Sequence, residues 1–277
     1  TFACFSYWLK LILVSAHLVS CPVCIRYRLT QYPIMSGKGS IGLSNRHLAS
    51  ATAFITFACF SYPIAVAGGW FADPSVAWWL GLKGLVLSLL VVTAAPTAAA
   101  AAFVLLLRGR YSIDAKRKII VAALLIPALV TLCAGFEVWS SAGYASKYLI
   151  STDCTRVKAK ADMQVSWATA AGVFDRCIES ATTAVDTRQC PGYKEITDGL
   201  GGQAIEYLAI MEETGSCTGW CSPSTPIWTQ TPSRDACSFV AGLVLKGQAG
   251  VAGTVVAHAA VVTVAAFGIA KAMPIEG

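Results

Sequence analysis

Charged residues are scarce in this chain. Asp, Glu, Lys and Arg make up 13% of the 277 residues and hydrophobic residues 56%, whereas soluble domains carry roughly 25% charge. The mean hydropathy is +0.61. Such a composition excludes an ordinary soluble globular domain and predicts an all-α integral membrane protein.

The chain also has no basic cluster of the kind that binds nucleic acid, and it has a single asparagine. The formal net charge is +6, but Lys and Arg form no face interleaved with aromatic residues and lie between apolar runs instead. Asn45 is the only asparagine and precedes Arg-His, which excludes N-glycosylation. We therefore expect lipids and other membrane proteins as partners, and no nucleic acid.

Acidic and histidine side chains are almost missing from the apolar runs. Glu137 and His258 are the two present, with no second acid and no activated nucleophile beside them, so we predict no enzyme activity, no metal and no cofactor. We expect these two residues to make hydrogen bonds between helices, and a ligand or proton role is the alternative.

Four apolar runs have the length that crosses ~30 Å of hydrocarbon as a helix. They cover residues 48–71, 84–107, 119–142 and 247–270, and Pro96 predicts a kink in the second. Between the second and third lies RGRYSIDAKRK, which the positive-inside rule places in the cytoplasm together with both termini. The first outer loop, around residues 72–77, is then short.

Residues 143–246 are predicted to form a folded extracytoplasmic loop. Residues 247–277 then form the fourth span and a short cytoplasmic tail. The loop holds 11 of the 15 acidic residues. It also contains six cysteines, which in an oxidising compartment predict three disulfides of unknown pairing: Cys154, Cys177, Cys190, Cys217, Cys221 and Cys237. Free buried thiols and a zinc site are the alternatives, although the loop has no histidine.

The second half of this loop is the most informative stretch. Ile205, Leu208 and Ala209 recur at helical spacing, with Glu206, Glu212 and Glu213 assigned to other faces, so a short amphipathic helix is predicted to run towards Cys217. CTGWC and a proline-rich, non-helical stretch follow. The tight corner around Gly219 can be tied both to Cys237 and to an earlier cysteine.

This order of features resembles the tetraspanin family: four spans, a short first outer loop, a short basic inner loop and a large cysteine-rich second outer loop. Cys217, Gly219, Cys221 and Cys237 are similar to the Cys-Cys-Gly and later cysteine of that family, and Glu137 resembles the polar residue of its third span. The resemblance implies a scaffold that organises membrane proteins laterally, at the plasma membrane or an endomembrane. A structural subunit of a large respiratory or photosynthetic complex and a four-span channel subunit are the alternatives.

Two kinds of contact are expected to serve this role. Small residues on the fourth span allow another helix to approach closely, within the bundle or from a neighbouring protein: Gly247, Gly250, Gly253 and Ala257. In the loop, Trp220, Ile227 and Trp228 are candidates for an exposed partner-binding patch. The alternative is that these three side chains fill the core of the loop.

The heptad TFACFSY occurs twice, at residues 1–7 and 56–62. If the protein starts at Met35, residues 35–142 form the first three spans with their loops, and residues 1–34 are a non-native or gene-model extension that copies part of the first span. The alternative is a fifth apolar segment, in which the pair Cys21 and Cys24 serves packing or lipidation.

Overall fold

The computed structural model describes residues 45–108, 111–180, 186–198 and 201–272. The chain divides into two units, residues 1–43 and 44–277, and all of the described residues belong to the second. They form helices and no β-strand, and four of these helices are long and apolar enough to cross a membrane. The all-helical, four-span prediction is confirmed to this extent. Residues 1–34, with their repeated heptad and Cys21–Cys24 pair, lie outside the described residues.

The first two long helices are joined by a single residue. Helix α3 covers Asn45–Ala72 and α4 covers Pro74–Arg108, so most of the predicted outer loop is helical. Asp73 makes this possible because its Oδ1 accepts the backbone N–H groups of Ser75 and Val76, at 2.9 and 3.2 Å. These N–H groups would otherwise have no partner in the first turn of α4.

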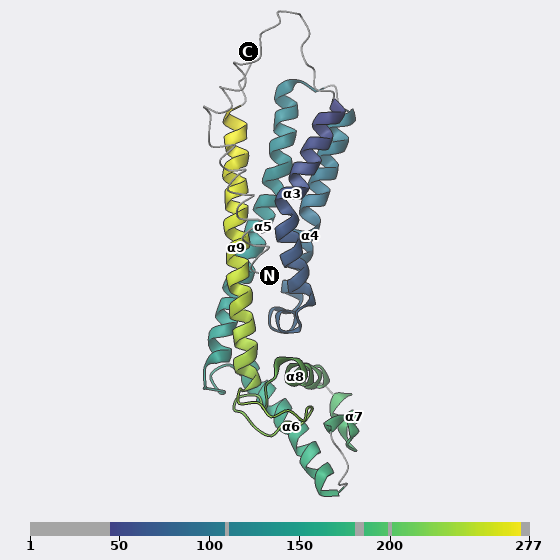
Figure 1. The fold of residues 1–277 in the computed structure, drawn as a ribbon, viewed down its shortest axis with the longest axis vertical. Helices are drawn as coiled ribbons and strands as arrows, with labels where there is room; N and C mark the ends of the chain where they lie inside the picture. The colour runs from purple at the N-terminus through teal and green to yellow at the C-terminus, as the bar shows by residue number, and fades with distance from the viewer. Residues whose placement is uncertain (1–44, 109–110, 181–185, 199–200, 273–277) are drawn as a thin grey trace, which may run out of the picture. The chain divides into compact units, whose positions relative to one another are not determined.

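Helix α4 is interrupted near its start (Figure 1). Gly81 has φ 58° and ψ −149°, a conformation that only glycine adopts at low cost. Pro96 lies inside α4, and the residue with a non-helical conformation is Gly81. Residues 74–80 therefore form a short separate segment that carries Trp78 and Trp79.

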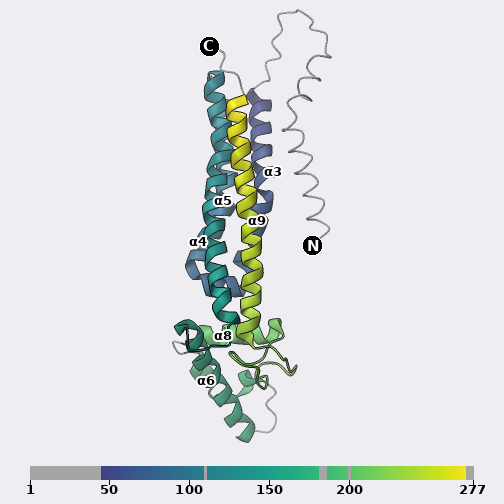
Figure 2. The ribbon, with the colours of Figure 1, turned by 90° about the vertical axis from the view of Figure 1, so that its left-hand side faces the viewer.

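Helices α5 (Ile113–Ile150) and α9 (Cys237–Ala272) form the most extensive helix pair and run side by side in both ribbon views (Figures 1 and 2). Their close approach depends on small residues, because a Cβ on Gly135 would lie 3.0 Å from Val256. The α9 residues buried in the bundle recur every three or four positions, as packing along one face requires: Ala249, Ala252, Val255, Ala259, Val262 and Ala266.

Helix α5 has 38 residues, so at 1.5 Å per residue it is about 57 Å long and exceeds the ~30 Å hydrocarbon thickness. It continues through residues 143–150, and α9 starts ten residues before the predicted span at Gly247. Both helices thus extend into the cysteine-rich part of the chain. Each extension carries an exposed lysine, Lys147 in α5 and Lys246 in α9, that interrupts the apolar run.

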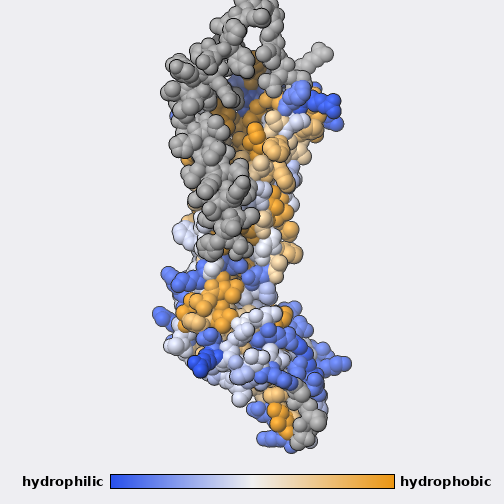
Figure 3. All heavy atoms as spheres, in the orientation of Figure 1, coloured by the Kyte–Doolittle hydropathy of each residue, from blue (hydrophilic) through white to orange (hydrophobic). Residues whose placement is uncertain are grey.

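The remaining elements lie between α5 and α9. They are α6 (Lys158–Ser180), the 3₁₀ turn η1 (Thr187–Gln189), α7 (Tyr193–Thr197) and α8 (Gly202–Gly215). Helix α8 confirms the predicted amphipathic helix, and residues 216–236 are non-helical as their prolines predicted. Figure 3 shows hydrophilic side chains gathered over this region and apolar side chains over the long helices.

Candidate functional site: the disulfide-linked region and its junction with the bundle

All six cysteines of the region are paired. The bridges are Cys154–Cys221, Cys177–Cys190 and Cys217–Cys237, with Cα atoms 5.9, 5.6 and 4.9 Å apart. The corner at CTGWC is therefore tied both to Cys237 and to an earlier cysteine. These bridges close loops of 67, 13 and 20 residues, and a chain-entropy estimate gives about 3–4 kcal/mol of stabilisation for each.

The corner itself depends on Gly219. Its φ is +66°, and a Cβ there would lie 2.2 Å from the carbonyl oxygen of Ser222. The carbonyl of Gly219 accepts the N–H of Cys237 at 2.9 Å, and the carbonyl of Trp220 accepts the N–H of Ser238 at 3.0 Å. The corner thereby satisfies donors at the start of α9 that have no partner within the helix.

Glu212 on α8 is buried, contrary to its predicted place on a polar face. Its Oε1 accepts the backbone N–H groups of Ile227, Trp228 and Thr229, at 2.8, 2.8 and 3.1 Å. Its Oε2 is buried without a hydrogen-bond partner among the described residues. Burial raises the pKa of Glu212, the three N–H groups oppose that rise, and nearby Asp186 adds to it.

Lys160 on α6 is the second buried charged side chain, with 1% exposure. Its ammonium donates to the carbonyl oxygens of Tyr148, Leu149 and Ser151 at the end of α5. These carbonyls have no partner within the helix and carry its partial negative charge. Burial lowers the pKa of Lys160. Lys160 therefore fixes the direction in which the chain leaves α5.

Trp220, Ile227 and Trp228 are buried, with exposures of 0%, 2% and 4%. The predicted exposed patch is therefore wrong, and the alternative that these residues fill the core is correct. The indole N–H of Trp220 donates to the carbonyl of Lys160 at 3.0 Å, and Glu212 holds the backbone of the other two residues inside.

The start of α4 packs into this core. The ring of Trp78 stacks on Tyr207 of α8 with centroids 5.1 Å apart, and Trp79 stacks on Trp220 at 6.1 Å. The indole N–H of Trp79 donates to the Tyr207 hydroxyl at 3.1 Å, which donates to Ser75 at 3.3 Å. Burial raises the pKa of Tyr207. The break at Gly81 thus presents a two-tryptophan segment to the disulfide-linked region.

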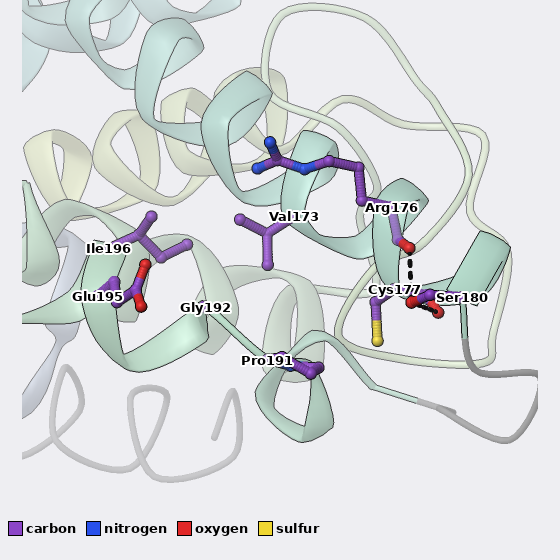
Figure 4. Close-up of a pocket in the computed structure, with 8 residues that line it drawn as sticks. All are labelled: Val173, Arg176, Cys177, Ser180, Pro191, Gly192, Glu195 and Ile196. Atoms are coloured by element: carbon purple, nitrogen blue, oxygen red, sulfur yellow. Dashed lines mark hydrogen bonds between the residues drawn. The ribbon is translucent and has the colours of Figure 1, made fainter.

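A groove of about 390 Å³ lies at the Cys177–Cys190 bridge. Figure 4 shows Val173 of α6 facing towards Ile196 of α7 across it. Arg176 and Glu195 line it and are exposed. The groove therefore combines an apolar wall with one charge of each sign.

Glu137 and His258 do not pair with each other. Glu137 of α5 forms an ion pair with Lys83 of α4, close to the Gly81 break. The side chains of Glu137 and Lys83 are 39% and 60% exposed. Among the described residues, no three His, Cys, Asp or Glu side chains are grouped to hold a metal ion.

His258 of α9 bonds to α3 at a place that a proline determines. Its Nε2 lies 2.6 Å from the carbonyl oxygen of Cys59, and a carbonyl only accepts, so Nε2 donates. Pro63 lies four residues after Cys59 and has no N–H, so this carbonyl has no partner within α3. Tyr62 donates to Thr254 at 2.6 Å, since the proton of Thr254 goes to the Val251 carbonyl.

The small residues of α9 are largely turned away from the bundle. Gly247, Gly250 and Ala257 are exposed, and a Cβ on either glycine would meet nothing within 4 Å. Gly253 is half-buried, and a Cβ there would lie 3.9 Å from the indole nitrogen of Trp139. Of the two contacts expected for this set, the three exposed residues do not make the one within the bundle, because the alanines of the opposite face fill that role.

Comparison of the chain with protein-family models, curated proteins and solved structures gave no match.

Asp73, Lys160 and Tyr207 are site residues that the sequence reasoning missed. The sequence did indicate the burial of Lys160, because Lys160 shares helical register with Met163 and Ala170 on the apolar face of α6. Asp73 directly before Pro74 is a helix-start pattern. Tyr207 had no such signal, since its partners lie in α4, more than 120 residues away.

Proposed function

We propose that this chain is a tetraspanin-like membrane protein that organises other integral membrane proteins laterally and has no catalytic role. In this proposal both termini and the basic α4–α5 connection face the cytoplasm, and the disulfide-linked region faces the other side. Two features support this orientation: basic residues favour the cytoplasmic side, and disulfides persist in oxidising compartments.

The observation that carries the proposal is the outward small-residue face of α9. Within lipid, helices associate where small side chains let backbones approach closely. The opposite, alanine-rich face of α9 packs against α5. Gly247, Gly250 and Ala257 therefore remain available to a helix of another protein. A second copy of the chain can use the same face.

Replacement of Gly250 by leucine tests this role. A Cβ at Gly250 meets nothing within 4 Å, so Gly250→Leu should leave the monomer folded while it blocks close approach of a partner helix. Gly69→Leu on α3 is the matched control, because Gly69 is exposed and has equally open surroundings. We expect Gly250→Leu to reduce cross-linking to membrane partners or to itself several-fold, and Gly69→Leu to leave it unchanged.

Equal cross-linking of the wild type and both variants would contradict the role of this face. Purification in mild detergent and reconstitution distinguish the organiser role from the two alternative functions. A shifting set of partners favours the organiser, whereas one complex of fixed stoichiometry favours a structural subunit. Ion conductance after reconstitution favours a channel subunit.

A further inference from the structure

A second hollow lies between α4 and α5, far from the disulfide-linked region. It measures about 310 Å³, and its lining is apolar except for one residue. Four residues of α4 and five of α5 line it: Ala98, Ala101, Ala102, Leu105, Lys118, Ile119, Ala122, Ala123 and Ile126.

The cross-section of this groove follows from its side chains. Ala102 and Ala123 are buried, at 3% and 4% exposure, whereas Leu105 and Ile126 are 43% and 56% exposed. Alanines thus make a floor between two larger apolar side chains on the outside of the helix pair. From Ala98 to Leu105 the helix rises about 10 Å, so the length of the groove suits part of one extended hydrocarbon chain.

One end of the groove is basic. Lys118 lines that end, and Arg108 follows Leu105 by three residues on α4. Lys118 also pairs with Asp114 at 2.8 Å, but both side chains are exposed, at 77% and 57%. An exposed pair of this kind contributes little energy, so the ammonium can exchange Asp114 for another anion.

We propose that this groove binds one anionic phospholipid of the leaflet next to the basic end. An acyl chain lies along the alanine floor, and the headgroup phosphate and its further negative charge lie at Lys118 and Arg108. The complementary charge selects an anionic over a zwitterionic headgroup. This inference needs the four spans but not the organiser role, so failure of the Gly250→Leu experiment would leave it intact.

Lipid retention by the full chain tests this site. The protein is purified in mild detergent with equal amounts of phosphatidylserine and phosphatidylcholine that share the same acyl chains, and retained lipid is counted by native mass spectrometry. We expect a preference for phosphatidylserine, and a fall of about fivefold in that preference in Lys118→Gln, the effect of one cation near an anionic headgroup. Asp114→Asn should strengthen the preference, because it removes the carboxylate that pairs with Lys118. Lys271→Gln is the control for charge: it removes a positive charge on α9 that does not line the groove, and it should leave the preference unchanged.

Ala101→Phe tests the acyl-chain site, because Ala101 is exposed and lines the groove. Its control is Ala100→Phe, since Ala100 is exposed on the same helix but does not line the groove. We expect Ala101→Phe to lose bound lipid of both types and Ala100→Phe to keep it. Equal retention of the two lipids by the wild type, equal behaviour of the two phenylalanine variants, or a change in oligomeric state in place of lipid loss would overturn the proposal.

Discussion

At the scale of single residues, Glu212 is a buried acid of the disulfide-linked region. Its three N–H partners join α8 to residues 227–229. Glu212→Ala leaves these buried donors unpaired and should lower the free energy of unfolding by roughly 1–3 kcal/mol. Tryptophan fluorescence during denaturation of the detergent-solubilised chain reports this, because Trp228 lies at the contact.

The pH dependence of Glu212 has a definite sign. Burial raises its pKa above the ordinary 4.5, so the folded state holds the proton more tightly than the unfolded state. Its contribution to stability is therefore full below pH 4.5 and is lost as the pH rises through the folded pKa. We expect the stability of the wild type relative to Glu212→Gln to fall as the pH rises above 4.5. A constant difference between the two proteins over that range would contradict a raised pKa.

Residue-scale prediction from the sequence succeeded for the cysteines and failed for the charges. Six cysteines in a charged segment predict disulfides without reference to the fold. Lys160 and Glu212 lie in helical register with the apolar residues of α6 and α8, so their spacing indicated a burial that their charge had spoken against. Trp220 and Trp228 lie in a non-helical stretch without such a register, so the sequence left them open between an exposed patch and a core.

At the scale of helices, Pro63 and His258 form a coupled pair. His258→Ala leaves the Cys59 carbonyl without a partner, whereas Pro63→Ala supplies an N–H within α3. The loss caused by His258→Ala should therefore be smaller in the Pro63→Ala background. We expect a coupling energy of about 0.5–2 kcal/mol in a double-mutant cycle, measured by unfolding in mixed micelles. Additive effects of the two substitutions would show that the bond does not depend on the proline.

Helix prediction was correct in number and order but not at the ends or the faces. Apolar runs locate long apolar helices, so they gave all four helices that could cross a membrane. They could not locate the break at Gly81 or the extensions of α5 and α9. They also could not identify which face of α9 packs, because lipid is as apolar as a helix partner and every face of a span is apolar.

At the scale of the whole molecule, the described residues join two helix pairs, α3–α4 and α5–α9, through the contact between α4 and α5. The core of the disulfide-linked region is continuous with that of the bundle through Trp78, Trp79 and Tyr207. The sequence predicted a cysteine-rich loop between spans three and four. It did not predict that α4 would pack into that loop, because this contact joins segments distant in the chain.

The central claim is that the disulfides and the basic α4–α5 end lie on opposite sides of the membrane. The most direct measurement labels intact cells with a membrane-impermeant maleimide, with and without an impermeant reductant, and quantifies peptides that contain Cys217, Cys221 and Cys237. We predict labelling only after reduction, and labelling of a Lys118→Cys variant at residue 118 only after the membrane is permeabilised. Labelling of the three native cysteines from the cytoplasmic side without reductant, or of residue 118 from outside, would contradict the account.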